Sequence, residues 1–105
     1  MAAADLTAIV KTLADPTRRA VLERIAREGE VAATRLVAGS KVSQPAVSQH
    51  LRALRDAGLV TERRDGRHIL YRAAPEGLDP LIDWIGHYRS FWRERFDRLE
   101  KLLKE

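Results

Sequence analysis

The stretch that decides the fold is Val42–Val60, which reads VSQPAVSQHLRALRDAGLV. Three apolar residues within it, Val47, Leu51 and Leu54, recur at the spacing of one face of an α-helix. Gly58 follows them, and glycine favours the position just beyond a helix C-terminus. The sequence therefore predicts a helix over about residues 43–57.

The opposite face of this helix carries hydrogen-bonding side chains at Gln44, Ser48, Gln49 and Arg52. In the DNA major groove, arginine pairs best with guanine and glutamine with adenine. This face is therefore suited to reading base edges, and the alternative is an ordinary solvated helix face. Ser43 is placed to cap the helix N-terminus.

Composition limits the classes of protein that fit. A chain of 105 residues corresponds to one domain, and the absence of cysteine excludes disulfides, thiolate metal sites and a cysteine nucleophile. No signal peptide and no membrane span is expected, which predicts a cytoplasmic protein without a membrane partner.

The net charge of +4 is concentrated in one part of the chain. Residues 41–72 hold seven basic and three acidic side chains, whereas the remainder holds twelve of each sign. A basic stripe beside a candidate reading helix is typical of phosphate binding.

Two helices and a short third one are expected before this stretch. Apolar spacing predicts a helix over about residues 5–14, and Asp15-Pro16 predicts the start of a second one ending near Gly29. Residues 31–38 have the length of the first helix of a helix-turn-helix, with residues 39–41 as its turn. Arg18 and Arg19 fit either a phosphate contact or a solvated helix face.

After Gly58 the pattern changes to that of a β-hairpin over about residues 60–73. Residues 60–64 and 67–73 flank Asp65-Gly66, and a two-residue loop there would pair Val60 with Tyr71 and Glu62 with Ile69. Arginines around the tip favour the wing of a winged helix over an ordinary solvated hairpin. They are Arg63, Arg64 and Arg67.

A long final helix is predicted over about residues 78–104. Its apolar residues follow a heptad and form a stripe wider than one small domain can cover, which favours a homodimer interface over packing within the chain. The heptad residues are Leu78, Leu81, Ile85, Tyr88, Trp92, Leu99 and Leu102.

Three segments together resemble the ArsR/SmtB family of winged-helix transcriptional repressors: Leu13–Ile25, Val42–Val60 and Gly66–Arg72. The resemblance implies a mainly α fold with a small β-hairpin, in the order α-α-α-α-β-β-α. It also implies a dimer in prokaryotic cytosol that binds double-stranded DNA at an inverted-repeat operator and represses transcription.

Carried over by position, the resemblance and the residue patterns assign two sets of residues. The DNA-binding set is Ser43, Gln44, Pro45, Ser48, Gln49, His50, Arg52, Arg63, Arg64, Gly66 and Arg67. The dimer interface joins the N- and C-terminal helices through Leu6, Ile9, Leu78, Leu81, Ile85, Tyr88, Trp92, Leu99 and Leu102.

The best-known members of this family sense metals, and here the sequence departs from them. The arsenic- and cadmium-type members carry a cysteine pair in the short helix where this chain has Val-Ala-Ala-Thr at residues 31–34, and the last helix offers a single histidine, His87, with Asp83 one turn before it. We therefore expect no metal site and no cofactor, as in the metal-independent members. A metal-responsive repressor using the last helix remains the alternative.

Two further classes of function bear on this sequence. Ser, His and Asp residues occur without the spacing of a nucleophile elbow or a phosphate loop, so no enzyme is expected. A winged helix used for protein–protein contact conflicts with the charge in residues 41–72 but stays open. So does control by an unidentified protein or small-molecule effector.

Overall fold

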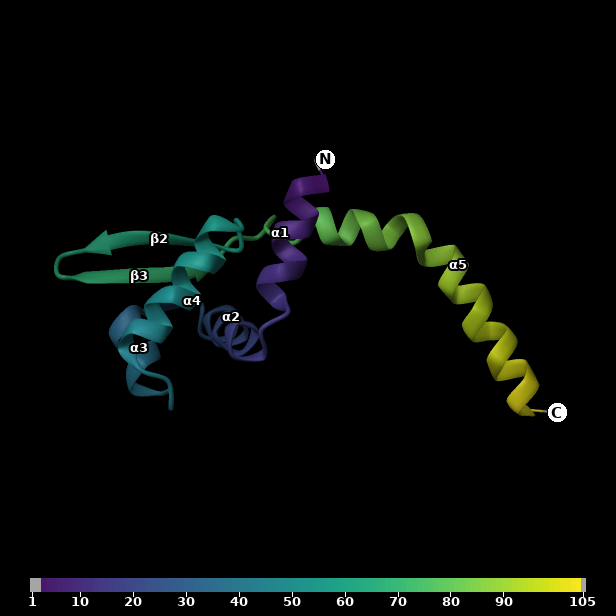
Figure 1. Cartoon of the computed structure of the whole chain (residues 1–105), viewed down its shortest axis with the longest axis horizontal. Helices are drawn as coiled ribbons and strands as arrows, with labels where there is room; N and C mark the ends of the chain where they lie inside the picture. The colour runs from purple at the N-terminus through teal and green to yellow at the C-terminus, as the bar shows by residue number, and fades with distance from the viewer. Residues whose placement is uncertain (1–2, 105) are drawn as a thin grey trace.

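The computed structural model describes residues 3–104 as a group of helices with a small antiparallel sheet, whose hairpin lies at one end and the long final helix at the other (Figure 1). The elements are α1 (Ala3–Leu13), α2 (Pro16–Glu28), β1 (Glu30–Ala32), α3 (Ala33–Ala38), α4 (Gln44–Asp56), β2 (Val60–Asp65), β3 (His68–Ala73) and α5 (Asp79–Lys104). This order confirms the predicted winged helix-turn-helix, with one strand more than expected.

The core is assembled around α4. Its three predicted inward residues, Val47, Leu51 and Leu54, are each no more than 2% exposed. Burying one such side chain stabilises the folded state by about 1.5–3 kcal/mol, so α4 is firmly held to the domain. The other buried apolar residues of this core are Ile9, Ile25, Val31, Leu36, Leu59, Val60 and Tyr71.

The additional strand, β1, corrects the expectation that a helix runs over residues 31–38. The sheet order is β1-β3-β2, and Val31 of β1 lies opposite Tyr71 of β3. Val31 is β-branched and 2% exposed, so it gains more from packing at this sheet edge than from a helical turn. The first helix of the helix-turn-helix is therefore α3, which begins only at Ala33.

The hairpin register also differs from the prediction. The loop is Gly66-Arg67 instead of Asp65-Gly66, because Asp65 pairs with His68 as the last residue of β2. Gly66 has a φ of +63°, whereas Arg67 has no positive φ. That combination suits a turn of type II′, which needs glycine at its first loop position only. The observed pairs include Val60 with Ala73, Glu62 with Tyr71 and Arg64 with Ile69.

This shift moves the pairing by two residues, so every side chain keeps its expected face. Val60 and Tyr71 still point into the core, at 2% and 9% exposed. The alternation of the sequence set the face, and the turn geometry set the register.

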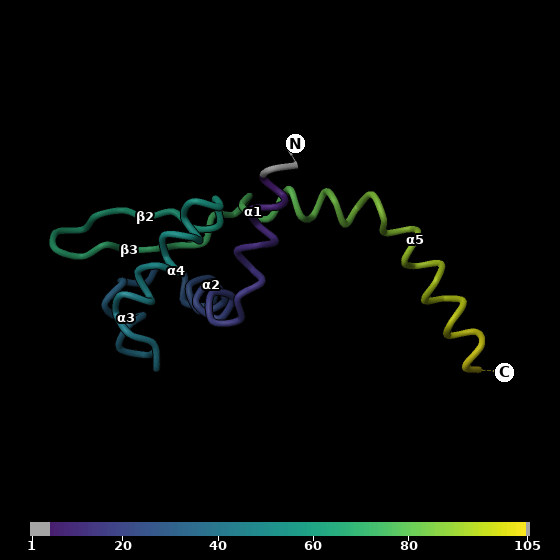
Figure 2. The backbone as a smooth tube through the Cα atoms, in the orientation of Figure 1, coloured from purple at the N-terminus to yellow at the C-terminus, as the bar shows by residue number. Residues whose placement is uncertain are grey.

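Helix α5 extends away from the rest of the molecule, as the tube in Figure 2 shows, and the longest dimension of the protein is 61 Å. Helix α1 packs against it, and Leu81 contacts the core. No side chain of α5 is buried. Its exposed apolar residues are Ile82, Trp84, Ile85, Tyr88, Phe91, Trp92, Phe96, Leu99, Leu102 and Leu103.

One residue assigned to the dimer interface lies elsewhere. Ile9 of α1 is 1% exposed and packs in the core of the protomer, so it offers no free surface to a partner. It lies on the face of α1 that packs into the core, which the apolar periodicity of α1 alone could not distinguish from an interface face. Across residues 3–104, no helix is both long and apolar enough to cross a lipid bilayer.

Candidate nucleic-acid interface

The two ends of α4 are fixed by local capping. At the N-terminus, the Ser43 hydroxyl accepts a hydrogen bond from the Ala46 amide at 3.3 Å. At the C-terminus, the Leu59 amide donates to the Leu54 carbonyl and the Gly58 amide donates to the Arg55 carbonyl. This pair of bonds is a Schellman motif, and it requires the left-handed conformation that Gly58 adopts at φ +78°. Both caps match the sequence prediction.

Between these caps, the polar face of α4 is open to solvent. Gln44, Ser48, Gln49 and Arg52 are all exposed, and Gln44 and Ser48 border a shallow groove that Val47 and Leu51 also line. A helix of 13 residues with one buried face and one polar face is suited to entering a major groove while staying attached to its domain. Pro45 lies within its first turn, where a missing amide proton costs nothing.

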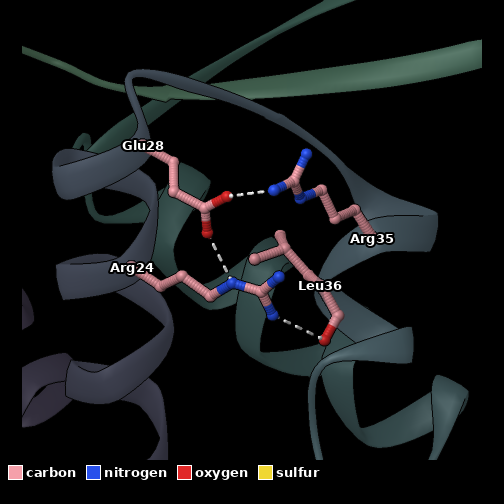
Figure 3. A network of polar contacts seen from close by, with 4 residues as sticks. All are labelled: Arg24, Glu28, Arg35 and Leu36. Carbon is pink, nitrogen blue, oxygen red and sulfur yellow. Dashed lines mark hydrogen bonds and ion pairs between the residues drawn. The ribbon is translucent and has the colours of Figure 1, made fainter.

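Helix α3 is held against α2 by the polar network in Figure 3. The Glu28 carboxylate accepts from Arg24 Nε at 2.6 Å and pairs with Arg35 Nη2 at 3.2 Å, while Arg24 Nη1 donates to the Leu36 carbonyl at 3.5 Å. The Arg24 hydrogen bond holds the pKa of Glu28 below its usual value. A Cβ atom at Gly39 would clash with the Arg24 guanidinium in its present position, so the glycine in the turn makes room for this network.

The arginines of the wing divide between the two faces of the hairpin. Arg64 lies opposite Ile69 on the face that carries Tyr71 into the core, while Arg63 lies on the other face. Arg63 donates two hydrogen bonds to the Glu30 carboxylate, at 2.7 and 2.8 Å, and these hold the pKa of Glu30 down. All three arginines of the wing are exposed. The charge of Arg63 is neutralised by the Glu30 carboxylate.

A different ion pair, between Arg55 and Glu62, joins α4 to the wing. Arg55 Nη1 donates to Glu62 Oε1 at 2.7 Å. The Arg55 bond lowers the pKa of Glu62, and burial raises the pKa of Tyr71. This pair joins the last turn of α4 to β2. Nothing in the local sequence pattern indicated it, because Arg55 and Glu62 belong to different elements.

His50 lies half-buried at the edge of α4, where Arg18 of α2 reaches it. Arg18 Nε donates to His50 Nδ1 at 3.3 Å. The sequence placed Arg18 on a solvated helix face or against phosphate, and the structure corrects this to a half-buried contact within the protein. The two residues are 32 positions apart, so only the tertiary fold brings them together.

Within residues 3–104, no three side chains of the His, Asp, Glu or Cys type gather as metal ligands. His87 and Asp83 lie exposed on α5, on the side away from its apolar stripe. The structure does build a capped helix with an exposed polar surface, an adjacent basic hairpin and an ion pair, Arg55–Glu62, that joins the two.

Known proteins are similar to this chain in sequence. A family model described as a helix-turn-helix domain matches residues 13–63. An arsenic resistance transcriptional regulator of Pseudomonas putida is 44% identical over 87 residues, which are 80% of this chain and 68% of that protein. The transcriptional repressor SmtB of Mycobacterium tuberculosis is 40% identical over 80 residues, which are 75% of this chain and 58% of that protein.

The fold is also similar to that of a solved structure. An ArsR-like transcriptional regulator from Rhodococcus superposes with a TM-score of 0.75 at 29% identity, covering 94% of this chain and 92% of that one. All three relatives are named as regulators or repressors of transcription. The sequence identity to the Pseudomonas regulator, together with the winged helix-turn-helix described above, shows that this chain belongs to the ArsR/SmtB family of transcriptional regulators.

Proposed function

We propose that this protein is a transcriptional repressor that binds an inverted-repeat operator as a homodimer, in the cytoplasm of a prokaryotic cell. The observation that carries the proposal is the exposed polar face of α4, held on the buried residues Val47, Leu51 and Leu54. With α4 in the major groove, Gln44, Ser48, Gln49 and Arg52 face the base edges, and Ser43 lies at the groove entrance. The similarity to named repressors supports this reading.

The homodimer rests on α5. Its apolar stripe is uncovered within the protomer, with Trp92 53% and Phe96 64% exposed. An apolar surface of this extent on a soluble domain favours association with a second copy. Because the stripe is heptad-spaced, two α5 helices can pack side by side, with exposed residues of α1 alongside. Two-fold symmetry then sets the two α4 helices about 34 Å apart, one turn of DNA.

We expect Gln44→Ala and Arg52→Ala to lose discrimination between operator and unrelated DNA. A bidentate base contact contributes about 1–3 kcal/mol of discrimination, so each variant should lose roughly that much. Fluorescence anisotropy with an operator duplex and a scrambled duplex at the same salt concentration measures it. Glu23→Ala, exposed on α2, serves as the matched control. Full operator preference in both variants would show that α4 is not the reading helix.

The wing is expected to contribute phosphate contacts that carry little sequence information. The double variant Arg64→Ala/Arg67→Ala should weaken binding to all DNA similarly and flatten the plot of log K against log salt. Each lost phosphate contact reduces that slope by about 0.9, so a loss near 1.8 is expected.

Arg63→Ala provides the control for the wing, because Arg63 has the same charge and lies on the other hairpin face, paired with Glu30. Its slope should match that of the unmodified protein. A slope unchanged by the double variant would rule out wing–phosphate contact. An equal reduction in Arg63→Ala would show that both faces of the hairpin meet DNA.

We also infer that DNA affinity does not respond to Zn²⁺, Cd²⁺ or arsenite. The chain has no cysteine, and a closed zinc site requires four ligands. Titration of the operator complex with each ion, for the unmodified protein and for His87→Ala, measures the response. If a metal weakens binding and His87→Ala abolishes that effect, then Asp83 and His87 form a sensor site and the inference fails.

A further inference from the structure

Arg18 lies where three helices meet. It is in the first turn of α2, and its backbone amide donates to Asp15 Oδ1 at 3.2 Å. That bond holds the pKa of Asp15 low. Its side chain runs toward the end of α1, where Nη1 lies 3.5 Å from the Thr12 carbonyl oxygen. Its Nε donates to His50 Nδ1 on α4 at 3.3 Å. A single guanidinium therefore contacts the last turn of α1 and the middle of α4.

The neighbouring arginine has a different position. Arg19 is exposed, and its Nη1 donates to the carbonyl of Leu13, the last residue of α1. Arg18 and Arg19 thus share charge, helix turn and a bond to the end of α1. Arg18 is half-buried and its side chain bonds His50, whereas the Arg19 side chain is exposed and makes no hydrogen bond to α4 within residues 3–104. This difference makes Arg19 a matched control for Arg18.

The chemistry of the contact fixes the form of His50. Arginine is always protonated and can only donate, so Nδ1 of His50 must accept. An imidazole that accepts at Nδ1 is neutral and carries its proton on Nε2. Arg18 therefore selects one tautomer and one ring orientation for a residue on the reading helix.

We propose that Arg18 is a positioning residue for DNA binding, which holds His50 as the Nε2–H tautomer and ties α4 to the junction of α1 and α2. The proposal rests on the proposed role of α4 as the reading helix. Because α1 packs against α5, this contact links the proposed dimer interface to the helix that reads DNA. The buried residues of α4 hold it to the core, and the Arg18–His50 bond adds a directional constraint at its middle.

The first measurement is independent of DNA. Imidazole ¹⁵N spectra of the whole protein report the protonation of each ring nitrogen, and His50→Gln identifies the His50 signals among the three histidines. We expect an unprotonated Nδ1 and a protonated Nε2 at His50. In Arg18→Met, which keeps the aliphatic stem but loses the donors, the two resonances should move toward each other. Arg19→Met should leave them in place.

The second measurement is operator affinity at fixed salt. A hydrogen bond contributes about 0.5–1.5 kcal/mol net, so Arg18→Met should weaken operator binding about twofold to tenfold. Arg19→Met, which removes the same charge, should leave operator affinity unchanged. Arg18→Lys can still donate to Nδ1 and should recover part of both the ¹⁵N pattern and the affinity. The double variant Arg18→Met/His50→Gln should lose no more than the larger single loss, because both remove one contact.

Unchanged ¹⁵N resonances of His50 in Arg18→Met would overturn the proposal. So would a changed pattern without loss of affinity, or an equal affinity loss in Arg19→Met. Thermal unfolding of each variant verifies that the fold is intact, and Arg18→Lys supplies both readouts if Arg18→Met does not fold. If the unmodified protein lacks operator preference, the proposed function fails, whereas the ¹⁵N pattern still reports whether Arg18 sets the His50 tautomer.

Discussion

Replacing Ile85 with glutamate should convert the protein to a monomer and weaken operator binding by about 10²–10⁴-fold, the range in which linking two binding sites raises affinity. Ile85 lies in the apolar stripe of α5 and is 51% exposed in the protomer. A carboxylate there would have to be buried unpaired between two copies of the helix, which is strongly unfavourable. The fold of each protomer should persist, because no α5 side chain belongs to the buried core.

Ser90→Glu is the control for this prediction. Ser90 lies five residues further along α5, about 140° around the helix, on its polar face. It receives the same charge on the same helix and should remain dimeric with unchanged affinity. Sedimentation velocity measures the oligomeric state, and fluorescence anisotropy compares the full operator with a half-site. A dimeric Ile85→Glu variant with full operator affinity would show that α5 is not the interface.

The largest effect on stability is expected for Leu54→Ala, which should lower the free energy of unfolding by about 2–5 kcal/mol. Leu54 is 0% exposed, and its carbonyl also accepts the Leu59 amide that closes α4. The substitution leaves a cavity at the centre of the core. Because single domains are stable by only about 5–15 kcal/mol, a large part of the stability would be lost.

Urea unfolding followed by circular dichroism measures this loss. All variants must be compared at one protein concentration, because dimerisation contributes to apparent stability. Ile69→Ala is the matched control, since Ile69 is also a large aliphatic residue but lies 37% exposed on the wing. It should cost clearly less than Leu54→Ala. Equal losses would mean that the core is not centred on α4.

The sequence by itself determined the elements whose signals are local. The boundaries of α4 follow from Ser43, its apolar spacing and Gly58, and the start of α2 follows from Asp15, whose carboxylate accepts the Thr17 amide at 2.9 Å. Caps and helical periodicity act within a few residues, so they can be read directly. The exposed polar face of α4 could be predicted for the same reason.

Tertiary structure decided what depends on distant partners. Strand β1 is three residues long and exists because β3 offers it an edge, and the hairpin register depends on the turn that Gly66 adopts. The roles of the arginines were decided in the same way. Arg18 meets His50 32 positions away, and Arg63 meets Glu30 33 positions away.

The assignment of Ile9 shows the same limit. Apolar periodicity marks a face that must be covered, but it does not say whether the chain itself or a partner covers it. In this protein Ile9 packs in the core, whereas the apolar face of α5 remains open. Only the position of each helix relative to the others distinguishes the two cases, because burial is a property of the assembled fold and not of any one segment.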